Sequence, residues 1–261
     1  MSRFSIRIAT VNLNGIVCKA KQSLVRDFVN LNDIDIVFFQ EMSMTSTSFL
    51  PGHDVILSYT NSCRSTAVAI RKNFVYSDML VDPSGRIISF IVNGVNFVNV
   101  YAQSGSQYKK ERNDFFTESI AIHLNKHFDS LVIGGDFNCV LSENDCRGAN
   151  NFCQGLQQLI DKMKLKDVAK HKIKKPVFTF FRGNSASRLD RFYFSANLVD
   201  KVYDVQTVPL AFSDHHSVIV KIEVDKLPPA AFTKPAYWKL NSAILKNEAL
   251  ISDYVHKINQ C

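Results

Sequence analysis

Short apolar runs recur along this chain, and each meets polar residues suited to phosphate chemistry at one end. A strand that runs out of hydrophobic residues leaves the core, so the polar side chains beside it lie at the rim of its sheet. The residues in such positions are Asn12, Asn14, Gln40, Glu41, Tyr101, Asp136, Asn138, Asp190, Asp214 and His215. When many strands bring carboxylates, amides, a phenol and an imidazole to one rim, the pattern indicates a metal-dependent hydrolytic site.

Composition and charge narrow the class of protein. The chain has 261 residues, of which 46% are hydrophobic and 20 are Phe, so it is long and apolar enough for one large globular domain. Its net charge of +7 favours a polyanionic partner, nucleic acid ahead of an anionic membrane. No apolar stretch approaches the roughly 20 residues that a bilayer requires, and no signal peptide is expected. The 6 cysteines have no C-x-x-C spacing and are expected to be reduced thiols of an intracellular protein.

The hydrophobic pattern predicts a mixed α/β domain over residues 1–225. Strands are expected near 5–12, 34–40, 54–59, 65–71, 87–93, 95–102, 130–136, 177–181, 188–194, 202–208 and 217–224. Helices are expected near 20–31, 109–127 and 152–164. Hairpins mixed with helical crossovers indicate two packed sheets with helices outside. Residues 226–261 begin with a proline-rich linker and continue as the start of a helix leading to a further domain, or as a terminal helix packed on the first one.

Two pairs of polar residues have the spacing of one strand face. Residues two apart on a strand point to the same side, so Asn12 is expected to share a face with Asn14, and Asp136 with Asn138. Glu41 follows a strongly apolar run, where a carboxylate is costly unless it binds a cation or lies at an open rim. These hard oxygen groups suit Mg²⁺ or Mn²⁺ better than Zn²⁺.

A set of spaced motifs carries a family resemblance. The motifs are Thr10-Val11-Asn12-Leu13-Asn14-Gly15, Gln40-Glu41, Val100-Tyr101-Ala102, Gly135-Asp136-Phe137-Asn138, Arg188-Leu189-Asp190 and Ser213-Asp214-His215. Together they resemble the endonuclease/exonuclease/phosphatase superfamily, which implies a deoxyribonuclease I-like α/β/β/α four-layer sandwich. Within it, the chain most resembles the endonuclease domain of non-LTR (LINE-type) retrotransposons. The segment Trp238-Lys239-Leu240-Asn241 favours that branch, because it resembles the segment leading towards a reverse transcriptase.

The resemblance implies an Mg²⁺-dependent enzyme, with Mn²⁺ able to substitute. Glu41 would be the principal metal ligand, with Asn14 and Asp214 near the ion. Repair enzymes have an aspartate at the position of Asn14, so the metal is expected to be bound more weakly here. The implied reaction is hydrolysis of one phosphodiester of double-stranded DNA, which leaves a 3′-hydroxyl that primes reverse transcription.

The same resemblance assigns the remaining roles. Asp136 would take a proton from the attacking water, while His215, oriented and kept cationic by Asp190, would hold the scissile phosphate. The family pattern gives phosphate contacts to Asn12 and Asn138, and Tyr101 would either contact the phosphate or help the departing oxygen. The chain departs from that pattern after Tyr101-Ala102, where Gln103-Ser104 stands in place of Pro-Asn. A phosphate contact by Ser104 is therefore the least supported of these assignments.

Further DNA contacts are expected around the strand near 177–181 and the turn after it. They are Thr179, Arg182 and Arg188, together with Ser104. A second candidate is the run 162–175, which has seven lysines and one acidic residue. It either lies along a DNA backbone or forms a solvated helix end and loop.

Three other functions remain open at this stage. The first is an apurinic/apyrimidinic repair endonuclease. The second is a phosphomonoesterase of the same superfamily that acts on a phosphoinositide or nucleotide. The third, a catalytically silent nucleic-acid-binding module, is disfavoured by the complete set of site residues. The retrotransposon interpretation implies a protein inside the cell, in the nucleus at its site of action, with a reverse transcriptase fused to it in the full-length polypeptide and without a membrane partner.

Overall fold

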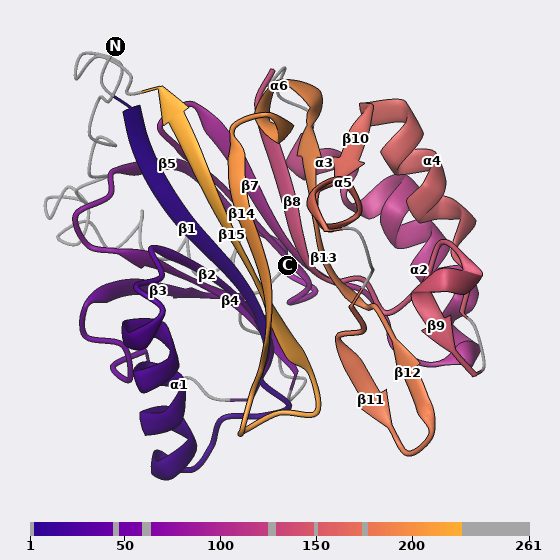
Figure 1. Cartoon of the computed structure of the whole chain (residues 1–261), viewed down its shortest axis with the longest axis horizontal. Helices are drawn as coiled ribbons and strands as arrows, with labels where there is room; N and C mark the ends of the chain where they lie inside the picture. Colours follow the sequence, from indigo (N-terminus) through magenta and orange to yellow (C-terminus); the bar gives the residue numbers. More distant parts are fainter. Residues whose placement is uncertain are drawn as a thin grey trace, which may run out of the picture.

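The structure is a computed structural model, and it describes residues 3–43, 47–58, 64–124, 129–148, 151–173 and 177–225. These residues form two mixed sheets packed face to face with helices outside (Figure 1). The predicted four-layer sandwich is confirmed. The linker and helix expected over 226–261 lie outside the described residues. Within the described ranges, no helix is long and apolar enough to cross a bilayer.

The first sheet carries both ends of the described chain. Its strands are β1 (Arg3–Asn12), β2 (Ile36–Met42), β3 (His53–Leu57), β4 (Ser65–Arg71), β14 (Val202–Pro209) and β15 (His216–Asp225). They lie in the order β14-β15-β1-β2-β4-β3, with β1 antiparallel to β15 and parallel to β2. The parallel pair needs a crossover, which α1 (Lys19–Leu31) supplies by packing Val25, Phe28 and Val29 on the outer face.

The second sheet has its own parallel pair. Its strands are β5 (Tyr76–Val81), β6 (Ile87–Val92), β7 (Val95–Tyr101), β8 (Leu131–Asp136), β10 (Leu165–Asp167) and β13 (Asp190–Ser195). They lie in the order β10-β13-β8-β7-β6-β5, and β7 runs parallel to β8. Outside it lie η1 (Ser106–Tyr108), α2 (Lys109–Asp114), the π-helical turn η2 (Phe115–Ser119), α3 (Ala121–Leu124) and α4 (Gln154–Met163). The shorter helices are η3 (Glu143–Asp145), α5 (Val168–Lys172) and α6 (Ala196–Val199).

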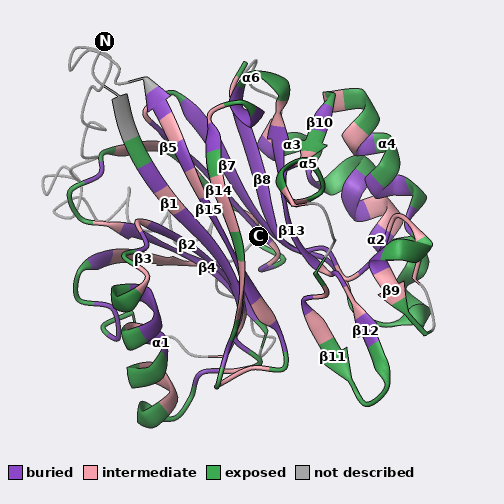
Figure 2. Ribbon diagram, viewed as in Figure 1, coloured by how far each residue is buried: buried purple, intermediate pink, exposed green. Residues whose placement is uncertain are grey.

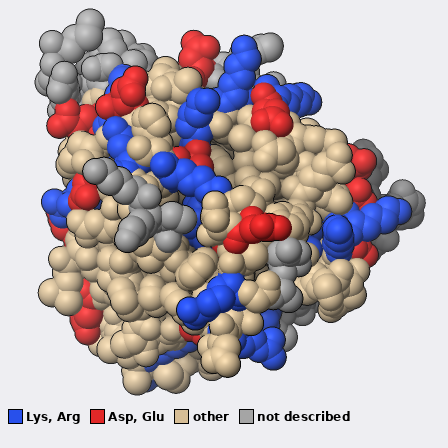
Figure 3. All heavy atoms as spheres, turned by 45° about the vertical axis from the view of Figure 1, so that its right-hand side comes forward, with Lys and Arg blue, Asp and Glu red and all other residues tan. Residues whose placement is uncertain are grey.

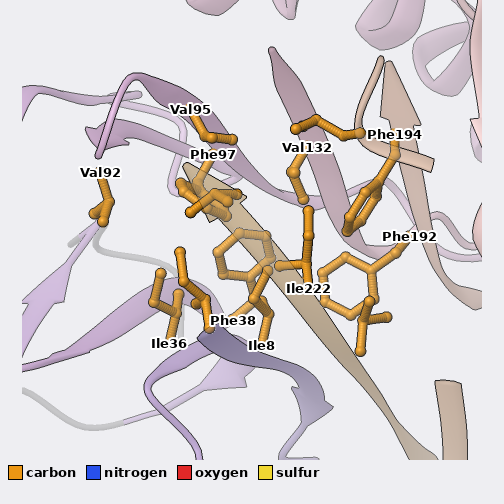
Figure 4. Close-up of a cluster of buried hydrophobic side chains, with 14 of the residues drawn as sticks. Ile8, Ile36, Phe38, Val92, Val95, Phe97, Val132, Phe192, Phe194 and Ile222 are labelled. Carbon is orange, nitrogen blue, oxygen red and sulfur yellow. The ribbon is translucent and has the colours of Figure 1, made fainter. Parts of the chain in front are cut away.

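The main core lies between the two sheets. Phe38 of β2 packs against Phe192 of β13, with ring centroids 5.7 Å apart, and both point into the space between the sheets (Figure 4). On β2 the neighbours of Phe38 turn the other way, because Val37 and Phe39 pack with α1. The central strands are thus buried on both faces (Figure 2), which explains their uninterrupted apolar runs.

A third, small sheet extends beside the sandwich. It consists of β9 (Cys146–Arg147), β12 (Ser185–Ser187) and β11 (Phe180–Arg182), and the hairpin β11–β12 projects at the bottom of Figure 1. Gly183 at its tip has φ +56°, a conformation that glycine adopts without a steric penalty. Residues 182–188, expected to be a polar turn between two strands, include the strand β12.

Two expectations about secondary structure are corrected. The helix expected over 109–127 is broken by η2, whose Phe115 and Phe116 are both buried against the second sheet. The edge strand β5 was missed, because its residues are mostly exposed or half-exposed and lack a buried apolar run. The Asn93-Gly94 hairpin is confirmed: both residues have positive φ and join Val92 to Val95, as a type I′ turn requires.

Candidate active site

Strand pairing brings the polar residues of both sheets to one rim. Asp136, the last residue of β8, is the pairing partner of Tyr101 on β7 and of Asp190 on β13. In the first sheet, Asn12 at the end of β1 pairs with Gln40 of β2. These ends meet where the lower ends of β1, β8 and β13 approach one another in Figure 1. The polar side chains that the sequence predicts at the rim of the sheets therefore do lie close together.

A β-bulge aims Glu41 at this rim. The pairing of β2 with β4 changes register between Phe39 and Met42, and Glu41 within this step has φ +54°. Its carbonyl accepts a hydrogen bond from the backbone N–H of Gly15 (3.0 Å), which ties the bulge to the end of β1. Bulges beside active sites commonly re-aim one side chain. This one turns a carboxylate out of an otherwise buried strand.

Asn14 and Asn138 reach the site by a turn and not along a strand face. Each has a left-handed backbone, with φ +44° and +49°. In both, the backbone N–H donates 2.9 Å to the side-chain oxygen two residues earlier, on Asn12 and Asp136 respectively. These are Asx turns, which end a strand and tolerate the left-handed region. The expectation that each pair shares a strand face was wrong, although the convergence that it implied is present.

Asn12 links the two carboxylates at the centre of the rim. Its Nδ2 donates to Asp136 Oδ2 at 2.9 Å and lies 3.4 Å from Glu41 Oε1. Tyr101 also donates to Glu41 Oε1, at 3.0 Å. Burial, reinforced by the charge of Glu41, holds the pKa of Tyr101 far above its usual value, so the phenol stays a donor. Asn12 and Tyr101 thus fix the position of Glu41.

His215 and Asp190 form a buried ion pair beside Asp136. His215 Nδ1 lies 2.8 Å from Asp190 Oδ2, and both side chains are shielded from solvent. Burial alone would lower the pKa of His215, but the charge and hydrogen bond of Asp190 outweigh it and raise that pKa to about 10. The imidazole is therefore a cation at neutral pH, and its Nε2 is left for another partner.

The carboxyl group of Asp136 has a pKa close to neutral pH. Burial, reinforced by the charge of Asp190, raises the pKa of Asp136 to about 7. Its oxygens accept hydrogen bonds from Asn12 and from both the backbone and the side chain of Asn138. A carboxyl group with such a pKa exchanges a proton readily at physiological pH, as a general base must.

Thr179 is buried and holds the segment that carries Asp190 by hydrogen bonds, so it is not a DNA contact. It is 1% exposed, and its Oγ1 accepts hydrogen bonds at 3.0 Å from the backbone N–H groups of Leu189 and Asp190. The expected DNA contact was wrong, because this hydroxyl is buried under the segment that carries Asp190.

Ser213 has a comparable role that sequence reasoning missed: it donates to Asn12 O (2.8 Å) and accepts from the N–H of His215 (3.1 Å).

Arg188 is also buried, and its predicted DNA contact is wrong. It is 2% exposed, with Nε 2.9 Å from Asp145 Oδ1 and a terminal nitrogen 2.7 Å from Asp167 Oδ2. A guanidinium between two carboxylates has no free surface for a phosphate. Arg182 and Ser104 are exposed, so their contacts with DNA remain predictions.

The Arg188 ion pair predicts a specific loss of stability in acid. Burial alone would raise the pKa of Asp145, but the charge of Arg188 outweighs it and lowers that pKa to about 2. The carboxylate therefore stabilises the fold above its unfolded-state pKa of about 4, and this contribution is lost as pH falls from there through about 2. Urea unfolding between these pH values should show wild type losing about 2 kcal/mol more than Asp145→Asn. Parallel pH profiles for the two proteins would contradict the assignment.

Two groups of side chains at the rim have ligand atoms for a metal ion. The ligand atoms of Asp136, Asp190 and His215 lie within 4.8 Å of one another. His215 fits poorly in that role, because its Nδ1 is engaged by Asp190 and its raised pKa keeps it protonated. The second group is Glu41 with Asn14 and Asp214, where Asn14 Nδ2 lies 3.2 Å from Asp214 Oδ1. Its oxygens are at the open edge of the rim, as a hydrated divalent cation requires.

The surroundings of Glu41 show that its carboxylate attracts cations. Arg64, immediately before β4, lies 3.3 Å from Glu41 Oε2, although its side chain is 60% exposed. Lys21 of α1 donates to the carbonyl of Asn14 at 3.3 Å. Neither cation was expected from the sequence, because neither stands in a motif. The second group therefore fits a divalent cation better than the first.

The comparison with family models identifies the fold family. The model described as "Endonuclease/Exonuclease/phosphatase family" matches residues 9–215, which include every rim residue described above. The chain belongs to this family. It is accordingly a member of a group of hydrolytic nucleases and phosphatases.

One curated relative of this family member is a transposon protein. It is the "Transposon TX1 uncharacterized 149 kDa protein" of Xenopus laevis, 27% identical over 267 aligned residues that cover 94% of this chain. The chain spans only 20% of the length of that relative.

Solved structures confirm the fold of this family member. The 3′-5′ exonuclease NExo of Neisseria meningitidis has a TM-score of 0.71 at 22% identity, over 83% of this chain and 99% of the exonuclease. An AP endonuclease from Archaeoglobus fulgidus has a TM-score of 0.69 at 19% identity, over 82% and 98%. The endonuclease domain of TRAS1, a telomere-specific non-LTR retrotransposon, has a TM-score of 0.60 at 16% identity, over 83% and 98%.

Proposed function

We propose that this domain is an Mg²⁺-dependent endonuclease that nicks double-stranded DNA and leaves a 3′-hydroxyl. The observation that carries the proposal is the link between two halves of one site: Asn12 joins Glu41 to Asp136, and Asp136 lies against the Asp190–His215 ion pair. A carboxylate for a metal, a carboxyl for proton transfer and an imidazolium for a phosphate oxygen thus stand at one rim.

Each group has a role that follows from its surroundings. Asp136 accepts the proton of the attacking water, and its pKa of about 7 suits that task. His215 presents positive charge to the scissile phosphate, held in orientation by Asp190. Asn12 and Asn138 now donate to Asp136, and they exchange these bonds for phosphoryl oxygens as negative charge builds there.

Glu41 would hold Mg²⁺, with Asn14 and Asp214 beside it, and Mn²⁺ would substitute. A bound divalent cation polarises the phosphoryl group and stabilises the charge of the departing oxygen. The donor set is all oxygen, and Tyr101 keeps one Glu41 oxygen in place while the other faces Arg64.

We further propose that the nick serves a LINE-type retrotransposon. The transposon relative supports this, since the chain covers a fifth of it and so matches one part of a larger polypeptide. In this proposal the 3′-hydroxyl primes reverse transcription by a polymerase elsewhere in the polypeptide, acting on nuclear DNA. The AP endonuclease neighbour favours repair of abasic sites as the second candidate.

A plasmid assay tests the nuclease and its metal. Supercoiled DNA should be converted to the open circle with Mg²⁺, remain supercoiled with a chelator, and be nicked again when Mg²⁺ is restored. Glu41→Gln should need at least about tenfold more Mg²⁺ for half-maximal rate, because it removes the charge at the metal. Nicking that persists in chelator, or the same Mg²⁺ requirement in Glu41→Gln, would overturn the metal assignment.

Substrate comparison separates the rival activities. The retrotransposon proposal predicts efficient nicking of intact duplex. A preference of about a hundredfold or more for an abasic duplex would favour the repair enzyme instead. Release of inorganic phosphate from a nucleotide or phosphoinositide, without nicking, would favour the phosphomonoesterase.

A further inference from the structure

An exposed basic surface lies outside the catalytic rim. It follows the end of α4, β10 and α5, and all of its side chains are exposed. We call it the lysine face; its residues are Lys162, Lys164, Lys166, Lys170, His171 and Lys172. On the side of the molecule that Figure 3 turns forward, lysine and arginine side chains stand out, with acidic side chains between some of them.

The charge of the lysine face is largely uncompensated. Of its lysines, Lys162, Lys164, Lys166 and Lys172 form no ion pair with any residue in the described part of the chain. Asp167, the only acid between residues 162 and 173, faces inward, with Oδ2 on Arg188 and Oδ1 on the backbone N–H of Lys170. The ion pairs with Arg188 turn Asp145 and Asp167 away from solvent, which leaves Asp161, beside Lys162, as the exposed acid next to this face. A net positive field is left at the surface.

Lys170 connects the lysine face to the segment that carries the catalytic ion pair, while Lys166 lies farther from the rim, paired with Phe194 of β13. Lys170 Nζ lies 3.0 Å from Asp145 Oδ2, and the other oxygen of Asp145 lies 2.9 Å from Arg188 Nε. Arg188 stands two residues before Asp190. Two exposed cations, Arg147 on β9 and Arg182 on β11, lie on the small sheet next to this segment. Cations therefore continue from the side of the rim onto α5.

We propose that the lysine face binds the phosphate backbone of the DNA duplex that flanks the nick. The proposal rests on the proposed nuclease function for the identity of the nucleic acid. Ammonium groups on flexible stems neutralise phosphates without reading base sequence, so the contact adds affinity and salt dependence but no sequence preference. It affects the binding of long substrates and not the chemical step.

The test removes three of these charges and varies the length of the DNA. Lys164, Lys166 and Lys172 are replaced together by glutamine, while Lys170 is kept because it pairs with Asp145. The matched control replaces Lys19, Lys72 and Lys110, which are exposed at other places on the molecule. Nicking is measured on duplexes of about 10 and about 40 base pairs that share one central sequence, since each added pair adds two phosphates.

Wild type should have a higher kcat/KM on the long duplex than on the short one. The lysine-face variant should lose this advantage, with kcat/KM on the long duplex falling about tenfold, kcat unchanged, and the short duplex unaffected. The slope of log kcat/KM against log salt should shrink by about 2 to 3 on the long duplex, or about 0.9 per lost phosphate contact. The control variant should keep the length advantage.

Two results would overturn the proposal: a length advantage that survives in the lysine-face variant, or an equal loss in the control, which would show a net-charge effect only. If wild type nicks neither duplex, the proposed function fails while the lysine face remains testable. Fluorescence anisotropy of the same duplexes without metal then measures binding alone. Equal affinity of wild type and lysine-face variant for the long duplex would reject the inference in that case.

Discussion

Asp136→Asn should lower kcat for plasmid nicking by about a thousandfold, with KM nearly unchanged. Asparagine has the same shape and can still accept from the backbone N–H of Asn138, so the rim should keep its geometry. What it lacks is the ability to take a proton from water. His215→Ala should cost as much, because it removes the cation that faces the phosphate and leaves Asp190 unpaired.

His216→Ala is the matched control for this prediction. His216 follows His215 in the chain but packs against Phe181 of the hairpin, with ring centroids 4.6 Å apart and the ring planes tilted by 38°. Its backbone N–H, which donates to Thr179 O, is unaffected by the substitution. The control should stay within about threefold of wild type. If Asp136→Asn retained a tenth or more of wild-type activity, Asp136 would not be the proton acceptor.

Arg188→Ala should destabilise the fold by about 3 to 5 kcal/mol, the largest stability effect expected of any substitution discussed. Within the described part of the chain, the substitution leaves Asp145, which is fully buried, with Lys170 as its remaining ion-pair partner and Ser142 Oγ as a hydrogen-bond donor, and it leaves Asp167 without its ion pair. Removing one member of a buried ion pair leaves an uncompensated charge in a poorly solvated place. Urea denaturation at neutral pH measures the loss.

Arg182→Ala is the control that distinguishes the effect of losing a buried arginine on stability from the effect of losing a positive charge in the same region. Arg182 lies on the adjoining hairpin, carries the same charge and is exposed, so its loss should change stability by less than about 0.5 kcal/mol. It should instead weaken DNA binding if the predicted contact is made. An Arg188→Ala protein as stable as Arg182→Ala would show that the buried network contributes little to the fold.

Local patterns predicted the fold well where both faces of a strand are buried. The run Ile36–Phe39 is uninterrupted because alternate side chains enter two different cores, and such runs are easy to find in a sequence. The strand β5 has one exposed face and a broken pattern, and it was missed. Rim residues were predictable for the same reason as the buried strands, since each one stands where an apolar run stops.

Burial and partners of the charged residues were not predictable. Arg188 and Arg182 look alike in sequence, yet one lies between two carboxylates and the other faces solvent. The partners Asp145 and Asp167 come from distant segments that only the folded sheet brings together. Arg64 was missed at Glu41 for the same reason, because the bulge that exposes Glu41 has no sequence signal beyond the residue itself.

Glu41, and not the Asp136–Asp190–His215 group, is expected to hold the cation at this rim. Anomalous scattering from Mn²⁺ in crystals of the protein with a DNA duplex locates the ion directly. We expect a peak about 2.1 Å from a carboxylate oxygen of Glu41, with Asn14 and Asp214 around it and the scissile phosphate on its other side. A peak coordinated by Asp190 and His215, with none beside Glu41, would contradict it.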